Sequence, residues 1–413
     1  MAKKFFDNMP EVDIIALRNS LGLEQLENII SLTFPQDGSM QLIRSFGGET
    51  ANYWWLKQVK LVLLGDDLTE NAVIADYNNQ QIDAGADLTG ASGQVMVRIP
   101  KIYFKETLDL DGTLIRVDVA PIKLAGFTCH PKFMRPNGTE RDCIYVGRYE
   151  AGSDGGTKLS SVSGVAPLTG VTLATFRSRA FARGAGWYPY DYYTHHLLQL
   201  LFYVYYTDFN SQAKLPGYTD ASAYTDVYKR NTGRSDNLTT MNGSVDADLA
   251  GIDAELVAAG ITAGEKIANQ FLFIENIFGH LWKMLDGVVF DGRIGQQNTA
   301  YVTADPTKFS SVDAEILANY GNLNVNLPAA TNESYMQSLQ SLFLPKIHGG
   351  GSSTYVTDYF WSYLDDENRN YFRLVRAGGA LNDGGKAGLA ARYSPYGLSY
   401  APSNLGSRLC AAP

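Results

Sequence analysis

The residue types best suited to contact another molecule gather near the C-terminus of the sequence. Residues 393–400 combine aromatic and small polar side chains, namely Tyr393, Ser394, Tyr396, Gly397, Leu398, Ser399 and Tyr400. Tyrosine supplies a large contact area with little loss of side-chain entropy, whereas serine and glycine adapt to the shape of a partner. The segment also lacks the apolar periodicity of a core element. We therefore predict a binding surface, and the alternative is a loop that only faces solvent.

A second aromatic segment, residues 355–371, precedes this one and alternates tyrosines with polar residues. In a strand, every second side chain points to the same face, so some of these residues pack inward and the others can join the same surface. The predicted ligand-binding residues are Tyr355, Tyr359, Tyr363, Asp365, Asn368, Asn370, Leu381, Asn382, Asp383, Tyr393, Ser394, Tyr396, Leu398, Ser399 and Tyr400.

Residues that could perform catalysis or bind a metal are sparse in the sequence. His195 and His196 are adjacent, so their side chains point about 100° apart on a helix, and their apolar neighbours predict core or boundary histidines rather than metal ligands. Residues 365–368 (Asp-Asp-Glu-Asn) offer oxygen ligands for calcium, but a solvated loop is the preferred interpretation. The sequence has no phosphate-binding loop, nucleophile elbow or His-Glu-x-x-His motif. We expect no catalytic residue, no metal and no cofactor.

The composition argues against a nucleic-acid-binding protein and against a membrane-spanning protein. The chain has 413 residues and a formal net charge of -9, without a lysine- or arginine-rich run, which argues against binding to nucleic acid. No stretch approaches the ~20 apolar residues of a membrane span, and no signal-peptide pattern follows the first residues. We therefore expect synthesis in the cytoplasm, without use of the secretory route. The three cysteines, Cys129, Cys143 and Cys410, are expected to be free thiols.

The elements that must position these residues follow from periodicity and turn signals. The length predicts two or three domains. Alternating residues predict a β-hairpin with a turn at Asp111-Gly112, and the helical and loop-forming patterns fall elsewhere. The predicted strands are 94–106 and 114–119; the helices are 12–30, 175–183 and 193–206; the loops are 152–164 and 212–252, with a hinge at 349–351.

A pattern of glycine, arginine and small residues surrounds the tyrosine-rich segment near the C-terminus. It reads Arg-Ala-Gly-Gly-Ala-Leu at 376–381, Ala-Ala-Arg at 390–392, and Asn-Leu-Gly-Ser-Arg-Leu-Cys-Ala at 404–411. This frame resembles the C-terminus of the formylglycine-generating enzyme family, which has a variant of the C-type lectin fold. It is also similar to the frame of variable proteins that retroelements diversify in phages and bacteria. In those proteins, the positions between the fixed residues are randomised and change the bound partner.

Upstream segments extend the resemblance. Residues 145–150 are similar to the first strand of that domain, and residues 275–287 are similar to its Asn-x-Trp-Glu-Trp segment, in which Asn276 and Trp282 are expected to be structural. Residues 96–133 look like the N-terminal part of phage tail receptor-binding proteins. The resemblance implies an α+β protein in three parts: an assembly or attachment segment at 1–49, a β-rich domain at 50–142, and a C-type lectin-like domain at 143–413 with a variable face at about 355–407.

The same resemblance argues for binding rather than catalysis. The enzyme family uses two cysteines five residues apart, and soft thiolates of this kind hold copper(I). The matching positions here are Gly384 and Leu389, which have no reactive group. Every residue between Tyr393 and Asn404 can arise from an asparagine codon by changes at adenines, as retroelement diversification would require. Leu381 and Ser407 depart from the family pattern, which has Trp and Phe there.

We therefore expect a phage receptor-binding protein of the tail fibre or tail tip, located in the virion. Its partners would be a host cell-surface protein or glycan, other virion tail proteins, and two further copies of itself in a homotrimer. Two alternatives are an enzyme of the formylglycine-generating type and a bacterial surface adhesin on the same fold. The missing cysteine pair argues against the first, and the missing secretion signal argues against the second.

Overall fold

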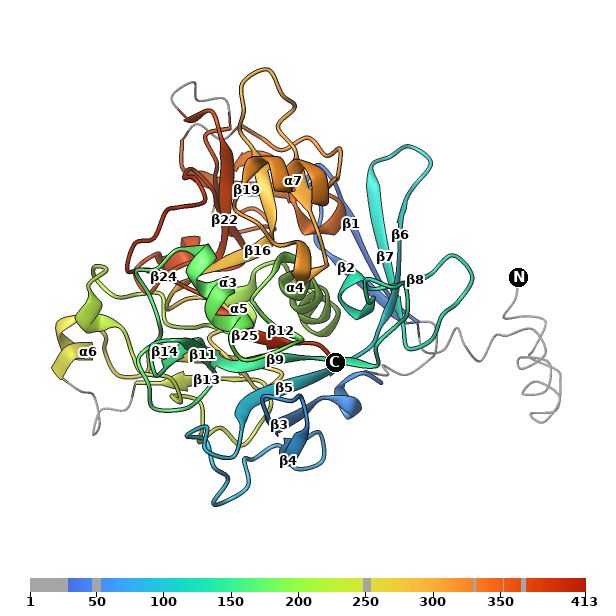
Figure 1. Cartoon of the computed structure of the whole chain (residues 1–413). Coiled ribbons are helices and arrows are strands. Elements are labelled where there is room, and N and C mark those ends of the chain that lie inside the picture. The colour runs from blue at the N-terminus through green and yellow to red at the C-terminus, as the bar shows by residue number, and fades with distance from the viewer. Residues whose placement is uncertain (1–28, 47–52, 248–253, 330–331, 352, 365–368) are drawn as a thin grey trace, which may run out of the picture.

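The computed structural model describes residues 29–46, 53–247, 254–329, 332–351, 353–364 and 369–413. Helices and strands are both present, so the α+β class predicted from the sequence is confirmed (Figure 1). The helix predicted at residues 12–30 lies outside the described residues except for its last two positions. Of these, Ile30 begins a strand. Within the described residues, most strands belong to three larger sheets.

The first of these sheets has five strands in the order β2-β1-β7-β6-β8. Its hairpin of β6 and β7 confirms the predicted turn, in which Asp109 accepts the backbone N–H of Thr113 at 2.6 Å. The single strand predicted at 94–106 is instead two strands in different sheets. The first ends at Pro100, which has no N–H with which to continue a ladder. The strands are β1 (Ile30–Pro35), β2 (Ile43–Phe46), β6 (Tyr103–Leu108), β7 (Leu114–Ala120) and β8 (Thr128–Cys129).

The second sheet joins the two ends of the chain. Its six strands have the order β12-β25-β9-β5-β3-β4, and Val146 in β9 faces both Val97 in β5 and Cys410 in β25. The domain boundary predicted at residues 142/143 therefore falls within one continuous sheet. The strands are β3 (Lys60–Leu64), β4 (Glu70–Asp76), β5 (Gln94–Pro100), β9 (Cys143–Glu150), β12 (Trp187–Pro189) and β25 (Arg408–Ala411).

The third sheet brings the C-terminal frame together. Its main order is β18-β17-β16-β22-β23-β21-β19-β20, and β24 pairs in parallel with β16. The predicted hinge at 349–351 overlaps the end of β20, so its first two glycines belong to a strand. The strands are β16 (Trp282–Asp291), β17 (Ala300–Val302), β18 (Gly321–Asn322), β19 (Ser334–Leu339), β20 (Pro345–Gly350), β21 (Tyr359–Trp361), β22 (Phe372–Gly378), β23 (Gly388–Tyr393) and β24 (Leu405–Gly406).

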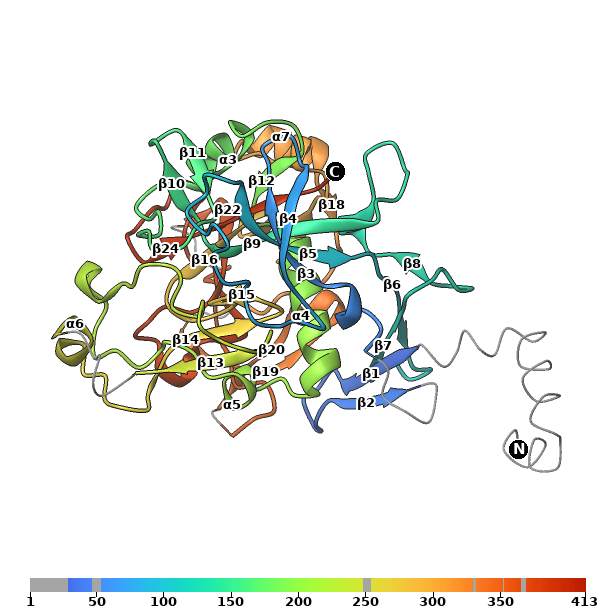
Figure 2. The ribbon, with the colours of Figure 1, turned by 90° about the horizontal axis from the view of Figure 1, so that it is seen from below.

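Helix α4 (Tyr192–Tyr206) lies in the middle of the molecule in both ribbon views (Figures 1 and 2). Thirteen of its 15 residues are buried, as the apolar run predicted. The side chain of Asp191 caps its first turn by accepting the N–H of Thr194 at 3.0 Å. His196 shares a 2.9 Å hydrogen bond with His130, and His195 contacts the carbonyl of Leu389 at 3.0 Å. Both histidines, predicted to lie in the core or at its boundary, are buried, and His195 ties the helix to β23.

Smaller elements complete the described fold. The predicted loop at 152–164 contains a short hairpin, because Gly155 and Gly156 supply a turn with positive φ angles of 57° and 79°. The predicted helix at 175–183 is observed two residues earlier, as α3. The remaining elements named in Figures 1 and 2 are β10 (Gly152–Asp154), β11 (Lys158–Ser160), β13 (Gly243–Asp246), β14 (Lys266–Phe271), β15 (Ile274–Glu275), α3 (Leu173–Phe181), α5 (Ser211–Lys214), α6 (Ala254–Ala258) and α7 (Asp313–Asn319).

Candidate ligand-binding face

Two buried arginines of the frame fix both ends of the tyrosine-rich segment 393–407. The guanidinium of Arg408 donates to four backbone carbonyls, those of Gly147, Arg148, Glu275 and Asn276, at 2.7 to 3.1 Å. Arg392 donates to the carbonyl of Leu389 at 3.1 Å and to the side-chain oxygen of Gln199, in α4, at 2.7 Å. The planar fork of arginine suits several acceptors at once. Residues 393–407 therefore run between two rigid anchors.

The glycines of the frame turn the chain where a side chain would clash. Gly378 and Gly379 have φ angles of 99° and 86°. A Cβ on Gly379 would lie 2.4 Å from the Cβ of Ala387. The loop between β22 and β23 therefore folds back tightly on itself, which only glycine permits at this position.

A charged network lies beneath the frame. Glu150 in β9 pairs with the ammonium of Lys283 at 2.9 Å and with His280. Burial disfavours the charged form of Glu150, but His280 and Lys283 outweigh this effect and lower its pKa to about 2. Burial lowers the pKa of Lys283 to about 8, against the attraction of Glu150. The network joins β9 to β16. It lies beneath the surface formed by about residues 355–407, which we call the candidate face.

The centre of the face is a buried cation enclosed by aromatic rings. The guanidinium of Arg376, in β22, lies 4.0 Å from the ring centre of Tyr393, in β23. Its distances to the ring centres of Trp282, Tyr396 and Tyr400 are 5.5, 5.6 and 5.3 Å. Arg376 is 3% exposed, and burial lowers its pKa to about 10. No carboxylate within the described residues forms an ion pair with it, so the ring faces stabilise its charge.

Beside this cation opens a cleft of about 140 Å³, which we call the Arg376 cleft. The phenol of Tyr359 donates to Glu333 at 2.8 Å, and Lys386 lies 3.7 Å from the same carboxylate. The side-chain oxygen of Asn404 is buried and has no hydrogen-bond partner. The cleft is lined by Trp282, Glu333, Tyr359, Arg376, Asp383, Lys386, Tyr393, Tyr400 and Asn404. Its walls therefore combine aromatic faces with both donors and acceptors.

Several residues predicted from the sequence meet at this cleft. Tyr359, Asp383, Tyr393 and Tyr400 line it, and Tyr396 stacks on Tyr400 with ring centres 3.8 Å apart. Burial raises the pKa values of Asp383, Tyr359, Tyr393 and Tyr400 above their ordinary values, so the phenols stay protonated and can donate hydrogen bonds. Leu398 is half-buried, and Ser399 is exposed beside it.

Two residues predicted to contact a ligand point inward instead, so the prediction is wrong for them. Leu381 is fully buried against Tyr218, because the Gly-Gly turn directs the chain into the protein and the N–H of Leu381 donates to the carbonyl of His280. Ser394 is also fully buried, and its N–H donates to the carbonyl of Trp361 at 2.7 Å. Neither side chain can touch a ligand at the surface, so both leave the proposed contact set.

The other predicted residues lie outside the Arg376 cleft. Tyr355 and Asn382 are exposed, and Tyr363 is half-buried under the guanidinium of Arg369, 4.5 Å from its ring centre. Asn370 is exposed and accepts the N–H of Ile294 at 2.8 Å. Asp365 and Asn368 lie outside the described residues, as does the rest of the calcium candidate at 365–368.

Sequence reasoning missed five lining residues of the cleft. Arg376 and Asn404 had been assigned to the frame and Trp282 to an upstream structural segment, but all three also line the cleft. The sequence offers one signal for Arg376, namely its position between the two aromatic segments 355–371 and 393–400. Glu333 comes from a loop and Lys386 from the short 3-10 helix that ends at it, and nothing in their local sequence indicates that they reach this site.

The positions that match the catalytic cysteines of the enzyme family have structural surroundings. Leu389 is fully buried, and its carbonyl contacts both His195 and Arg392. Gly384 lies in a 3-10 helix, η8 (Gly384–Lys386), beside open space. Cys129, Cys143 and Cys410 are free and buried, as expected. In the part of the chain that the structure describes, no three His, Cys, Asp or Glu side chains are grouped to hold a metal ion.

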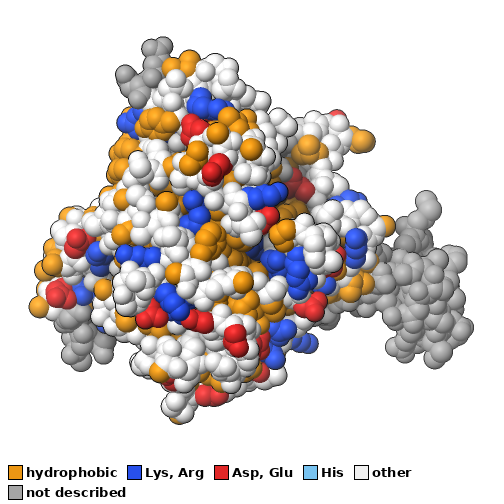
Figure 3. Space-filling model, viewed as in Figure 1, with side chains coloured by type: hydrophobic (Ala, Val, Ile, Leu, Met, Phe, Trp, Pro, Cys, Tyr) orange, Lys and Arg blue, Asp and Glu red, His pale blue; other side chains and the backbone are white. Residues whose placement is uncertain are grey.

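Comparison with known proteins adds no assignment. A scan against protein-family models finds no match to this chain, and a search of curated proteins finds none either. No helix among the described residues has both the length and the apolar character needed to cross a membrane. On the face shown in Figure 3, basic and acidic side chains are interspersed.

Proposed function

We propose that this protein is a phage receptor-binding protein of the tail fibre or tail tip, which recognises a host cell-surface ligand through the face around the Arg376 cleft. The observation that carries the proposal is the meeting of Tyr359, Tyr393 and Tyr400 with Arg376 at one cleft. Tyrosine and arginine are enriched where proteins bind other molecules tightly. These side chains come from the neighbouring strands β21, β22 and β23 and from the segment that follows β23, so the sheet brings them together.

The proposal includes a C-type lectin-like domain with a variable face. Three features of the frame support it. The double glycine at 378–379 turns the chain, and Arg392 and Arg408 each donate to backbone carbonyls and hold the backbone in place. The side chains between Arg392 and Arg408 are mostly half-buried or exposed. A frame that fixes the backbone and leaves the intervening side chains accessible suits a segment whose residues change while the fold stays the same.

The ligand proposed for this face is a protein or a glycan of the host surface. The aromatic rings offer flat apolar contact, and Glu333, Asp383 and Lys386 offer hydrogen-bonding and charged groups at the cleft. In the virion the protein would attach to other tail proteins and assemble as a homotrimer, which multiplies weak contacts into avidity. The proposed role is binding, without catalysis and without a cofactor.

A cell-binding experiment tests this function. Fluorescently labelled protein is applied to a panel of bacterial strains, and the bound fraction is compared with that of Tyr400→Ala. Loss of a central aromatic contact is expected to weaken binding by about 2 kcal/mol or more. Tyr77→Ala, which changes a half-buried tyrosine directly after β4, serves as the matched control. Protease-treated and glycosidase-treated cells distinguish a protein ligand from a glycan. Equal binding by wild type and Tyr400→Ala would refute the proposal.

A further inference from the structure

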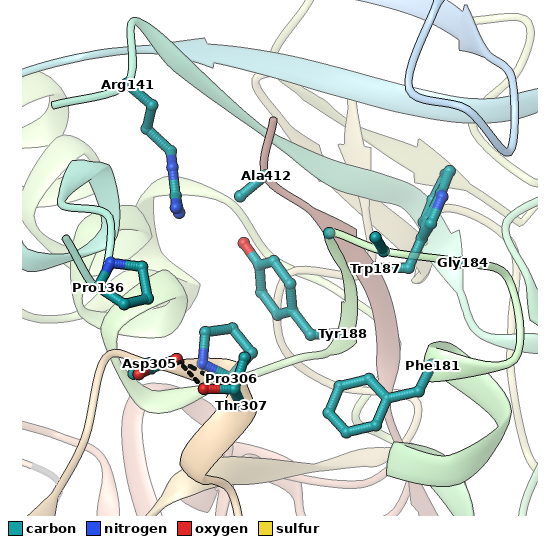
Figure 4. Close-up of a pocket in the computed structure, with 12 residues that line it drawn as sticks. Pro136, Arg141, Phe181, Gly184, Trp187, Tyr188, Asp305, Pro306, Thr307 and Ala412 are labelled. Carbon is teal, nitrogen blue, oxygen red and sulfur yellow. Dashed lines mark hydrogen bonds between the residues drawn. The ribbon is translucent and has the colours of Figure 1, made fainter. Parts of the chain in front are cut away.

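A second and larger cleft lies between strand β12 and the 3-10 helix η5 (Pro306–Lys308). Its volume is about 620 Å³, which is within the ~300–1,000 Å³ of typical small-molecule sites. None of its lining residues belongs to the Arg376 cleft. Figure 4 shows Arg141, Tyr188 and Pro306 around a common space, with Phe181 at its edge. We call it the Arg141 cleft.

Among the described residues that line this cleft, Arg141 is the one strongly basic group, and it is buried without a direct ion pair. Arg141 is 7% exposed, one of its terminal nitrogens donates to the carbonyl of Lys132 at 3.3 Å, and its Nε has no hydrogen-bond partner. Burial lowers its pKa, although arginine remains charged. No described carboxylate forms a direct ion pair with it, and the negative charge of Asp305 only partly offsets the effect of burial on its pKa. A carboxylate bound in the cleft would accept hydrogen bonds from the guanidinium and stabilise its buried charge.

The walls of the cleft are flat and apolar. Phe181 is 41% exposed, although it is a large hydrophobic residue. Trp187 and Tyr188 come from β12, and Pro136 and Pro306 line the cleft beside Arg141 and Asp305. Tyr188 is held firmly, because the ammonium of Lys132 lies 3.8 Å from its ring centre and pairs with Asp191 at 2.7 Å. Rigid rings of this kind suit a planar aromatic ligand.

The carboxylate of Asp305 also lines the cleft and would orient a charged ligand within it. Asp305 accepts the N–H of Thr307 at 3.0 Å and its hydroxyl at 2.7 Å, so its charge is fixed in place. An anionic group is repelled from Asp305 and attracted to Arg141, while an apolar body fits against Phe181 and Pro306. We propose that the Arg141 cleft is a binding site for a small aromatic molecule that carries one carboxylate.

Isothermal titration calorimetry of the full chain with 2-naphthoate tests this site, with the uncharged 2-naphthamide as the matched ligand. Wild type is expected to bind the carboxylate roughly tenfold or more tightly than the amide, because only the carboxylate pairs with Arg141. Arg141→Gln is expected to remove this preference. Phe181→Ala, at an exposed position, is expected to weaken both ligands. Lys57→Gln removes an exposed cation elsewhere and is expected to change nothing.

The comparison of the two ligands on wild type needs no variant, so it decides the question even if Arg141→Gln fails to fold. Equal affinity for naphthoate and naphthamide, or absence of naphthoate binding at about 1 mM, overturns the proposal. Unchanged naphthoate affinity in a folded Arg141→Gln or Phe181→Ala protein overturns it as well. A preference for the carboxylate that Arg141→Gln abolishes and Lys57→Gln preserves supports it.

Discussion

Arg376 and Tyr393 face each other across strands β22 and β23, and the guanidinium of Arg376 lies 4.0 Å from the centre of the Tyr393 ring. A cation–π contact of this kind is worth about 0.5–2 kcal/mol, more when both groups are desolvated. Four rings surround the same guanidinium, and their geometry depends on its planar shape. The cation therefore organises the tyrosines of the candidate face as well as contributing its charge.

Replacing Arg376 by lysine tests this organising role. A compact ammonium keeps the charge but cannot stack on several rings. We expect the free energy of unfolding to fall by about 1–2 kcal/mol and binding to host cells to be lost. Urea denaturation and the cell-binding assay measure the two effects. Arg179→Lys, which changes an arginine on α3 that contacts Ser153, is the control. If Arg376→Lys keeps the stability and the cell binding of the wild type, Arg376 does not organise the tyrosines of the face.

The double glycine of the frame gives a second prediction. Gly379→Ala should destabilise the protein by more than about 2 kcal/mol, because its φ is 86° and the new Cβ would lie 2.4 Å from that of Ala387. Gly385→Ala lies in the same loop, but its nearest neighbour would be 3.8 Å away, so little change is expected. Thermal unfolding of the two variants compares them directly. Equal melting temperatures would show that this turn is not constrained.

The buried carboxyl of Asp358 predicts a pH-dependent stability. It accepts the N–H of Ala390 at 2.6 Å, and burial raises its pKa from 3.8 to about 7. Between these values, the folded protein holds a proton that the unfolded chain releases. The stability that this proton provides is therefore complete below about pH 4 and is lost as the pH rises through 7.

Asp358→Asn keeps the neutral form at every pH. The wild type loses stability as the pH rises through this window, whereas the variant does not. The difference in the free energy of unfolding between Asp358→Asn and wild type should therefore grow by up to about 1.4 kcal/mol per pH unit. Denaturant titrations at pH 4, 5.5 and 7, spanning the two pKa values, measure the difference. Asp111→Asn, at an exposed turn, should show no such trend. A constant difference between Asp358→Asn and wild type would mean that Asp358 is ionised in the folded protein.

Local sequence patterns predicted some parts of the fold and of the site but not others. Helix α4 and the hairpin of β6 and β7 were predictable, because their signals lie within about 20 consecutive residues. The pairing of β9 with β25 was not, since it joins Val146 to Cys410 and no local pattern specifies such a partner. The tyrosines of the face were recognised from residue type. The inward direction of Leu381 depended on the turn before it, and Glu333 reaches the cleft only through the tertiary fold.

The proposed homotrimer predicts a solution mass near three times that of the 45.3 kDa chain. Cyclic assembly would place three copies of the candidate face on one particle and raise the avidity for a host surface. Light scattering coupled to size-exclusion chromatography at micromolar concentration measures the mass. A particle of one chain mass would contradict the assembly but leave the binding proposal to its own test.

The absence of a reactive pair at Gly384 and Leu389 predicts that the protein does not oxidise cysteine to formylglycine. Copper(I) is held by soft thiolates, and the three cysteines of this chain are buried. Burial also raises the pKa of Cys410 well above its usual range, which disfavours the thiolate. Incubation with copper and a cysteine-containing sulfatase peptide should therefore leave the peptide mass unchanged. Leu389→Cys combined with Gly384→Cys restores the two thiols and serves as a comparison. Catalytic conversion by the wild-type protein would replace the receptor-binding proposal with an enzymatic one.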